Sequence, residues 1–269
     1  MADSPPIPGD PGRPTVARLH DVALGGKDNY AADREMAAKL EEIFSLGMVL
    51  ARESREFQAR AVDYVARHGV TQFIDVGSGM PATPATHEVA AQVSPDARVA
   101  YVDNDPVVNA HAAALLARPG QVASVPGDLR RPTEILASPE LTSVIDTSKP
   151  FCVILAMVLN FVDAAEAAHI IAELRDAMPP GSFLMLSLGV NDNALDMAQE
   201  FIDAYSAAQV HLHTREQVAG YFAGLELVEP GLTEARHWRP AQSPAETEPA
   251  DTGPRLADAL VGVARKPVS

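Results

Sequence analysis

A short turn with two glycines is the part of the chain best suited to chemistry. The segment reads Phe73-Ile74-Asp75-Val76-Gly77-Ser78-Gly79-Met80-Pro81, so a hydrophobic run ends in an acid and two glycines. Gly77 and Gly79 carry no Cβ and let the backbone approach a ligand closely. We expect Ser78, between them, to contact the same ligand, which would also face the positive N-terminus of the following helix.

Two details favour a cationic ligand over a dinucleotide at this turn. Asp75 stands before the first glycine, where its charge would repel a pyrophosphate and attract a cation. Ala82 stands where the dinucleotide fingerprint has its third glycine, which a closely bound pyrophosphate needs. We therefore predict that Asp75 contacts the amino group of a cationic ligand, directly or through water.

Acids also end the next two hydrophobic runs. Asp103 ends the first of them, and an acid there can accept hydrogen bonds from both hydroxyls of a ribose. Asn104 adjoins it, and Asp105 is expected to cap the next helix. Asp128 ends the second run and can accept a hydrogen bond from an exocyclic amine such as that of adenine. Leu129 would offer its backbone amide and an apolar face to the same ring.

Two further segments could meet a second substrate. Met157 and Asn160 follow the fourth hydrophobic run, where a donor and its acceptor would come together, and Met157 is assigned to the donor. Asn29, Tyr30 and Arg34 lie in or beside a turn rich in glycine, which is typical of a lid over a pocket. Asn29, Tyr30, Arg34 and Asn160 are therefore candidate lid or substrate contacts.

The histidines give no clear catalytic or metal-binding pattern. His20, His87 and His111 are each isolated and are predicted to be structural or surface residues. His211 and His213 are two residues apart without further ligands nearby, so no metal is predicted. No catalytic residue can be assigned from the sequence.

The elements that position these residues alternate regularly after residue 70. Hydrophobic runs separated by helical patterns predict βαβ units and a parallel sheet. Strands are expected at 72–76, 98–103, 121–126, 151–158, 182–190, 224–230 and 260–263. The chain is expected to divide into a disordered leader (1–14), an N-terminal helical cap (15–69) and a ligand-binding core (70–269), with an exposed loop at 240–254.

Composition limits the partners. The chain has 269 residues, and its formal net charge of −15 disfavours nucleic acid and anionic membrane surfaces. A small-molecule acceptor is therefore favoured. No apolar run is long enough to span a membrane and no secretory signal is evident, so a cytoplasmic location is expected. The single cysteine, Cys152, lies in an apolar run and is predicted to be a buried strand residue.

Together, the acid-x-Gly-x-Gly turn and the two later acids resemble class I S-adenosylmethionine-dependent methyltransferases. The chain is still more similar to one actinobacterial group, the S-adenosyl methyltransferase family first catalogued as a domain of unknown function. The stretches that carry this resemblance are Leu-Gly-Gly-Lys-Asp-Asn (24–29), Ala-Ala-Asp-Arg-Glu (31–35), Ala-Arg-Glu-x-Arg-x-Phe (51–57), Asp-Val-Gly-Ser-Gly (75–79), Val-Asp-Asn-Asp-Pro (102–106), Gly-Leu-Glu-Leu-Val-Glu-Pro-Gly-Leu (224–232) and His-Trp-Arg-Pro (237–240).

The resemblance implies an α/β, Rossmann-like class I methyltransferase fold. This fold has a central, mostly parallel seven-stranded sheet with helices on both faces and, in this family, an N-terminal helical cap. It also implies that S-adenosyl-L-methionine binds at the tips of the first three strands. Asn160 stands where many class I relatives have histidine, and a general base is needed only if the acceptor must lose a proton. The resemblance names no acceptor and no oligomeric state.

Three other functions remain open at this point. The same pocket could bind S-adenosylmethionine or S-adenosylhomocysteine without turnover, as in a regulatory protein. It could transfer the aminopropyl group of the same donor instead of its methyl group. An NAD-dependent oxidoreductase is disfavoured by Asp75 and by the missing third glycine.

Overall fold

The computed structural model describes residues 9–190, 195–240 and 258–268. The first eight residues of the predicted leader lie outside this range. The predicted loop at 240–254 lies outside it as well, except for its first residue.

A single sheet organises the described part of the chain, with the strand order β3-β2-β1-β4-β5-β8-β6. Five strands run parallel to one another: β1 (Gln72–Val76), β2 (Arg98–Asp103), β3 (Val122–Pro126), β4 (Cys152–Ala156) and β5 (Phe183–Val190). The long strand β8 (Asp258–Arg265) is antiparallel to β5. The prediction of a mostly parallel sheet in an α/β fold is thus confirmed.

The count of seven strands needs correction, because the sheet of the described residues has eight. Beyond β6 (Glu226–Leu227), a second two-residue strand, β7 (Thr233–Glu234), pairs with β8. Two residues are too few to show the alternation that reveals a strand in a sequence. Strand β8 is also longer than its predicted range of 260–263, because it pairs with β5 along its whole length.

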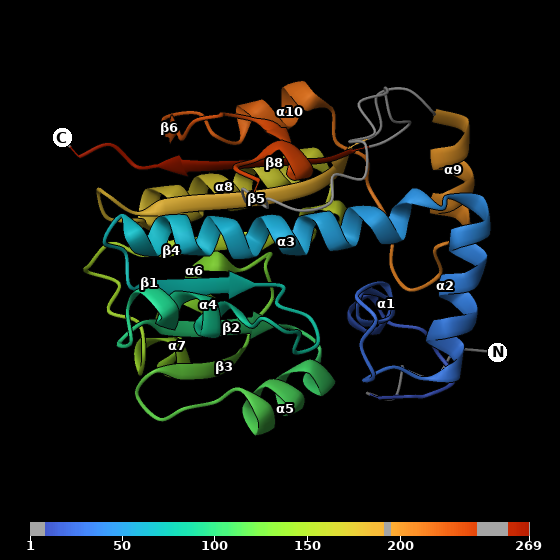
Figure 1. Cartoon of the computed structure of the whole chain (residues 1–269), viewed down its shortest axis with the longest axis horizontal. Coiled ribbons are helices and arrows are strands. Elements are labelled where there is room, and N and C mark those ends of the chain that lie inside the picture. The colour runs from blue at the N-terminus through green and yellow to red at the C-terminus, as the bar shows by residue number, and fades with distance from the viewer. Residues whose placement is uncertain (1–8, 191–194, 241–257, 269) are drawn as a thin grey trace.

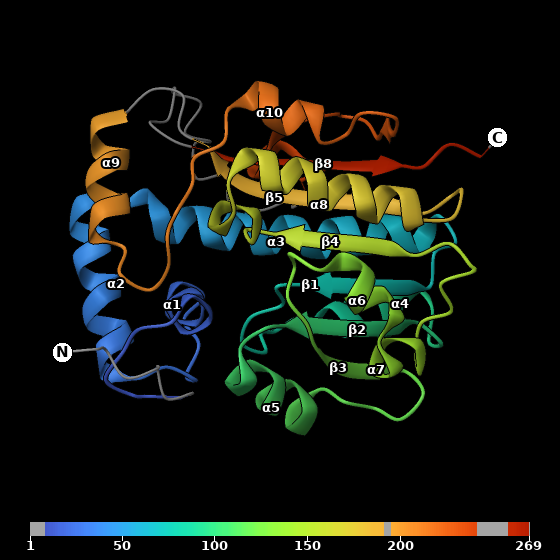
Figure 2. The ribbon, with the colours of Figure 1, turned by 180° about the vertical axis from the view of Figure 1, so that it is seen from behind.

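Helices cover both faces of the sheet (Figures 1 and 2). Side chains alternate between the faces along each strand, so that Phe73 packs on one side and Ile74 on the other. On the first side lie α3 (Leu46–Arg67) and α4 (Thr86–Val93). On the second lie α6 (Pro132–Ala137), α7 (Pro139–Thr142), α8 (Ala164–Ala177) and α10 (Arg215–Gly220). Cys152 is fully buried in β4, as predicted.

Three helices stand beyond the carboxyl ends of the parallel strands: α1 (Val16–Ala23), α2 (Ala31–Ile43) and α9 (Leu195–Ala204) (Figure 1). A buried ion pair joins α1 to α2, since Arg18 Nε lies 2.8 Å from Asp33 Oδ2. Helix α3 extends from this group across the face of the sheet. It thereby links the helices around the strand ends to the core.

Helix α5 (Pro106–Leu115) begins where the sequence predicts, because Asp105 accepts a hydrogen bond from the backbone of Val107. Gly69, predicted to end the preceding long helix, has a positive φ of 87° directly after α3. Within the described residues, we find no helix with both the length and the apolar character required to cross a lipid bilayer.

Candidate functional site

A cavity of about 910 Å³ opens between the carboxyl ends of the parallel strands and helices α1, α2 and α9. Its wall includes the turn after β1 and the ends of β2, β3 and β4. Ligands of open α/β sheets bind in this position, outside the carboxyl ends of the strands. The volume lies in the upper part of the range of about 300–1,000 Å³ for ligand pockets, which leaves room for two small molecules.

The glycine turn is tied to the tip of β2. The backbone N–H groups of Gly77 and Ser78 both donate to the carbonyl of Val102, at 2.8 and 3.1 Å. Gly79 donates its N–H to Asp103 Oδ2 at 2.9 Å. The other oxygen of Asp103 accepts the N–H of Asp105, also at 2.9 Å.

Asp103 can still bind a ligand after making these two bonds. Each carboxylate oxygen accepts two hydrogen bonds, so one site remains on each oxygen for a pair of hydroxyl groups. Burial raises the pKa of Asp103 above its usual range, while the backbone N–H groups oppose this effect. Asn104 is exposed at the cavity rim beside it.

The two glycines of the turn differ in what surrounds them. A Cβ on Gly77 would lie 2.3 Å from Cγ2 of Val158, so the protein itself requires glycine there. A Cβ on Gly79 would meet no atom within 4 Å, and this residue lines the cavity. Both residues have positive φ, 71° and 66°. Gly79 is therefore the better candidate for close approach to a ligand.

Asp75 is buried at the end of β1 and also lines the cavity. Its Oδ2 accepts hydrogen bonds from Gln58 Nε2 at 2.9 Å and from Thr86 Oγ1 at 2.7 Å. Burial raises the pKa of Asp75, and the hydrogen bond from Thr86 is the largest opposing effect. Both hydrogen bonds involve the same oxygen, which leaves Oδ1 available to a ligand in the cavity.

Asp128 and Leu129 reach the cavity from the end of β3. Asp128 Oδ1 accepts the N–H of Arg130 at 3.0 Å, and its side chain is 38% exposed. Arg130 Nε also lies 3.2 Å from Glu166 Oε1. Leu129 is buried against the core, so this corner combines an acid with an apolar side chain.

Met157 holds an unusual backbone conformation beside the glycine turn. Its φ is +56°, which is uncommon for a residue with a long side chain. Its N–H donates to the carbonyl of Ser187 at 2.9 Å. The hydroxyl of Ser187 lies 2.6 Å from that of Ser54 in α3. Strain of this kind collects at ligand sites, where the surrounding structure enforces it.

Asn160 lines the cavity, but its amide group is engaged in holding the wall together. Its Nδ2 donates to the carbonyls of Gly189 and His211, at 2.9 and 3.3 Å. Its Oδ1 accepts the N–H of Gly189 at 3.0 Å. Through these hydrogen bonds, Asn160 links the segment before α10 to the end of β5.

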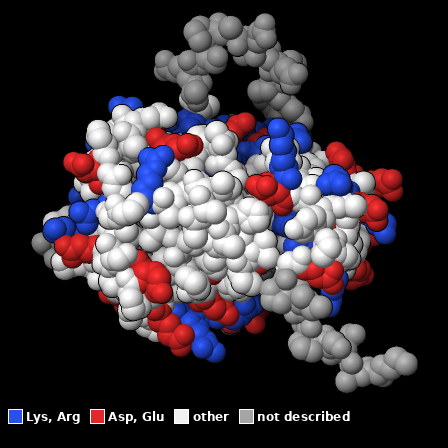
Figure 3. Space-filling model, turned by 90° about the horizontal axis from the view of Figure 1, so that it is seen from below, with Lys and Arg blue, Asp and Glu red and all other residues white. Residues whose placement is uncertain are grey.

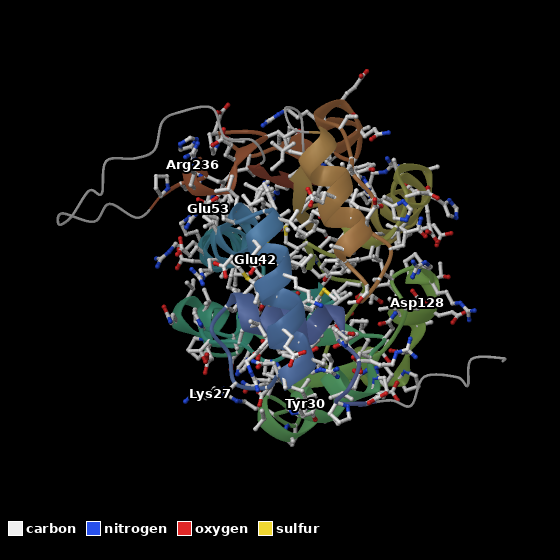
Figure 4. All side chains as sticks on the ribbon, turned by 90° about the vertical axis from the view of Figure 1, so that its right-hand side faces the viewer. Lys27, Tyr30, Glu42, Glu53, Asp128 and Arg236 are labelled. Carbon is white, nitrogen blue, oxygen red and sulfur yellow. The ribbon has the colours of Figure 1, made fainter. Side chains whose placement is uncertain are left out.

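The candidate lid residues Asn29, Tyr30 and Arg34 are not part of the cavity wall. Asn29 Nδ2 donates to Asp21 Oδ2 at 2.8 Å, and Arg34 donates to Asn29 Oδ1 at the same distance. Tyr30 is 41% exposed on the outside of the molecule, apart from Asp128 of the cavity (Figure 4).

The turn formed by residues Leu24–Asn29 folds around the carboxylate of Asp21. A Cβ on Gly26 would lie 1.8 Å from Asp21 Oδ1, and the N–H of Asp28 donates to Asp21 Oδ2 at 2.9 Å. The glycine and the polar residues therefore fold the turn around a buried acid.

Several cavity residues come from the N-terminal helices and were not predicted as site residues; His20 among them was predicted to be a structural or surface residue. Gln58 and Arg55 reach the glycine turn from α3, where Arg55 donates to Gln58 and to the carbonyl of Ala82. His20 reaches the cavity from α1. Burial and the positive charge of Arg55 lower the pKa of His20 to about 4. No spacing along the chain could have connected these residues with the turn after β1.

The cavity wall is acidic within the described residues, with seven carboxylate side chains and two arginines. Its acids are Glu41, Asp75, Asp103, Asp105, Asp128, Asp163 and Glu166. Such a wall suits a cationic ligand and opposes a pyrophosphate. No group of three His, Cys, Asp or Glu among the described residues has the arrangement of a metal site.

Two solved structures are similar to this chain over almost its entire length. A DUF574 family protein from Streptomyces avermitilis is 34% identical, with a TM-score of 0.87, over 96% of this chain and 99% of that one. A candidate methyltransferase from Thermobifida fusca is 35% identical, also with a TM-score of 0.87, over 96% and 97% of the two chains. No curated protein sequence matches the chain.

The sequence model of the family described as S-adenosyl methyltransferase matches residues 5–267. That match agrees with the geometry of the site, in which an acidic cavity lies beside a glycine turn at the carboxyl ends of the strands. The chain belongs to the S-adenosyl methyltransferase family and is an enzyme that uses S-adenosylmethionine as its methyl donor.

Proposed function

We propose that the enzyme binds S-adenosylmethionine across the ends of β1, β2 and β3. It methylates a small molecule held in the same cavity, on the side formed by α1, α2 and α9. The observation that carries this proposal is Asp103, which is fixed by two backbone N–H groups and keeps one acceptor site on each oxygen. A ribose presents two neighbouring hydroxyls that match this pair of sites.

The adenosine part of the donor would occupy the side of the cavity formed by β2 and β3. Asp103 would accept the ribose hydroxyls, and Asn104 would contact them from the rim. Asp128 would accept the exocyclic amine of adenine, because its second oxygen is not engaged by the backbone of Arg130. Leu129 would pack against the ring.

The amino-acid part of the donor would follow the glycine turn. Gly79 leaves open space beside the backbone, and Ser78 lines the same part of the cavity. The free oxygen of Asp75 would accept the ammonium group of the donor. Met157, with its strained backbone, would lie beside the reactive sulfur.

A small acceptor is favoured over a nucleic acid by charge and by enclosure. The chain carries a formal net charge of −15. On the face seen in Figure 3, basic side chains are interspersed with acidic ones around a mostly uncharged centre and form no basic patch. Helices α1 and α2 and the segment 205–212 contribute to the cavity wall opposite the strand ends. A phosphate backbone would need a basic surface.

The donor supplies a methyl group already activated by its cationic sulfur. The protein's part is then to hold the two reactants in line, and orientation of this kind can contribute about 7–11 kcal/mol in favourable cases. The bonds from Gln58, Thr86 and Gly79 fix the acids of the donor site before the donor binds. Little reorganisation is then needed on binding.

Calorimetric titration with S-adenosylmethionine, S-adenosylhomocysteine and NAD tests this proposal. Micromolar binding of both adenosyl compounds and none of NAD is expected. Binding of NAD alone would contradict the assignment of the site. Product analysis then separates the functions that use the same pocket, because methyl transfer yields S-adenosylhomocysteine, aminopropyl transfer yields methylthioadenosine and a pure binder yields neither.

A further inference from the structure

Four aromatic side chains line the part of the cavity next to α2 and α9: Phe44, Phe161, Phe201 and Tyr205. We call this group the aromatic wall. Its rings form a chain of contacts, with centroid distances of 5.9 Å for Phe44–Phe201, 5.7 Å for Phe201–Tyr205 and 6.0 Å for Phe161–Tyr205. They come from the end of α2, the turn after β4 and the region of α9.

The aromatic wall differs from the aromatic residues of the core. Phe57, Phe73 and Phe151 are completely or almost completely buried by other protein atoms. All four rings of the wall are only half-buried. Their remaining surface borders the cavity, so a ligand with an apolar surface would remove it from water.

The geometry of the wall favours a flat ring over an aliphatic chain. Aromatic pairs prefer edge-to-face or offset arrangements with centroids about 4.5–7 Å apart, and such pairs stabilise a complex beyond the burial of apolar area. The Phe44 and Phe201 rings meet edge to face at 76°, whereas Phe201 and Tyr205 are tilted by 39°. A further ring placed against them can make such contacts with several of them at once.

His20 supplies a polar group in the same cavity. It lies on α1, whose Ala17 packs against Met80 just after the glycine turn. Among the described residues, no side chain or backbone group makes a hydrogen bond to its ring nitrogens. Arg55, which is close enough to lower the pKa of His20, binds the carbonyl of Ala82 beside that turn. His20 therefore lies near the donor site with a free imidazole.

We propose that the acceptor is a planar aromatic molecule with a hydroxyl group, that its ring packs on the aromatic wall and that its hydroxyl is hydrogen-bonded to His20. This inference rests on the proposed function, since it names the acceptor class for that site. The hydroxyl oxygen forms its bond to the methyl carbon while the carbon–sulfur bond breaks with its electron pair on sulfur. The hydroxyl proton passes to a ring nitrogen of His20, so one positive charge moves from sulfur to the imidazole.

The environment of His20 favours a phenol over an aliphatic alcohol. With a pKa of about 4, its imidazole is neutral at physiological pH and can accept a proton, but it is a weak base. A phenolic hydroxyl has a pKa of about 10, like that of tyrosine, and is far more acidic than an aliphatic hydroxyl. A weak base can serve only when the group it deprotonates is itself fairly acidic.

Binding of three probes to the protein saturated with S-adenosylhomocysteine tests the proposal without turnover. The probes are 2-naphthol, its saturated counterpart trans-2-decalol and 2-methoxynaphthalene, in which the hydroxyl is blocked. We expect 2-naphthol to bind about tenfold more tightly than either of the others. Equal affinity for 2-naphthol and trans-2-decalol would overturn the aromatic acceptor.

Two pairs of variants separate the roles of the wall and of His20. Tyr205→Leu should lose most of the preference for 2-naphthol over trans-2-decalol, whereas Tyr205→Phe, which keeps the ring, should retain it. His20→Leu should bind 2-naphthol and 2-methoxynaphthalene equally and form 2-methoxynaphthalene from 2-naphthol at least about tenfold more slowly. The matched control His169→Leu changes an exposed histidine outside the cavity wall and should behave like the parent protein.

The titration with S-adenosylhomocysteine alone separates this inference from the function on which it rests. If that compound binds normally and 2-naphthol does not bind, the acceptor class is wrong and the donor site stands. If S-adenosylhomocysteine itself does not bind, the proposed donor site is contradicted, and the acceptor class that rests on it is contradicted as well. A His20→Leu variant that keeps both the preference for a free hydroxyl and the parent rate would overturn the role of His20.

Discussion

The backbone N–H of Gly79 donates to Asp103 Oδ2 over 2.9 Å, and this bond joins the turn after β1 to the tip of β2. Two residues that are 24 positions apart thus share one hydrogen bond at the centre of the proposed donor site. The same carboxylate is held from the other side by Asp105. A ligand that binds Asp103 therefore meets an acid whose position is already fixed.

Replacement of Asp103 by alanine should weaken binding of S-adenosylmethionine at least about tenfold, a loss of about 1.4 kcal/mol or more. The variant loses both acceptor oxygens for the ribose and leaves the N–H of Gly79 without its partner. Calorimetry with the folded variant measures the effect. Asp96→Ala, which removes an exposed acid away from the cavity, is the control. Unchanged affinity in Asp103→Ala would remove this residue from the site.

Alanine at Gly77 and at Gly79 should have different consequences. Both changes impose a positive φ on a residue with a Cβ, which costs about 1–2 kcal/mol. Only at Gly77 would the new Cβ also collide with Val158, so Gly77→Ala should unfold at the lower temperature. At Gly79 the methyl group would enter open space, so Gly79→Ala should mainly lose ligand affinity.

Thermal unfolding and calorimetry on this pair measure stability and binding separately. Gly77→Val, the more drastic change, would collide with Val158 even without a ligand. Its loss of binding would therefore say nothing about ligand approach. Normal binding by Gly79→Ala would contradict close approach of the donor to the turn.

Asp75→Asn should make the ligand-free protein more stable at neutral pH. Burial raises the pKa of Asp75, so the folded chain keeps this proton to a higher pH than the unfolded chain does. Stability then falls as the pH rises from the usual aspartate pKa through the raised one. Asparagine keeps an oxygen for Gln58 and Thr86 but carries no charge. The free-energy cost of burying a charged carboxylate is then absent, so the melting temperature should rise near pH 7.

The gain from Asp75→Asn should shrink towards about pH 4, where aspartate begins to be protonated in the unfolded chain as well. Melting curves at several pH values test this, with Asp96→Asn as the exposed control. Affinity for S-adenosylmethionine should fall in the same variant, because the carboxylate would no longer attract the ammonium group. A gain that does not depend on pH would contradict the electrostatic explanation.

Arg18→Leu should destabilise α1 and α2 by about 3–5 kcal/mol, because it leaves the buried carboxylate of Asp33 without its cation. Hydrogen exchange should show faster exchange in these two helices and little change in the strands. Arg67→Leu, which breaks an exposed ion pair with Asp63, should change little. Equal loss of protection across the strands would contradict our proposal that α1 and α2 open separately from the core.

The sequence by itself determined the core of the fold and the positions of the donor-site candidates. Strands β1 to β5 are strongly apolar and helices separate them, so their parallel pairing follows from rules of chain connection. Asp75, Gly79, Asp103 and Asp128 then lie at the ends of strands or directly after them, and parallel strands bring those ends together. Local pattern was sufficient because each residue is placed by its own strand.

Only the tertiary structure decided which residues form the other side of the cavity. His20, Gln58 and Tyr205 lie on helices or beside them, and the face that each helix turns toward the sheet depends on packing between distant segments. The same cause placed Tyr30 outside the cavity, since the turn before it folds around Asp21 instead of a ligand. Contacts between distant segments leave no periodic signal in a single sequence, and those contacts shape the proposed acceptor site.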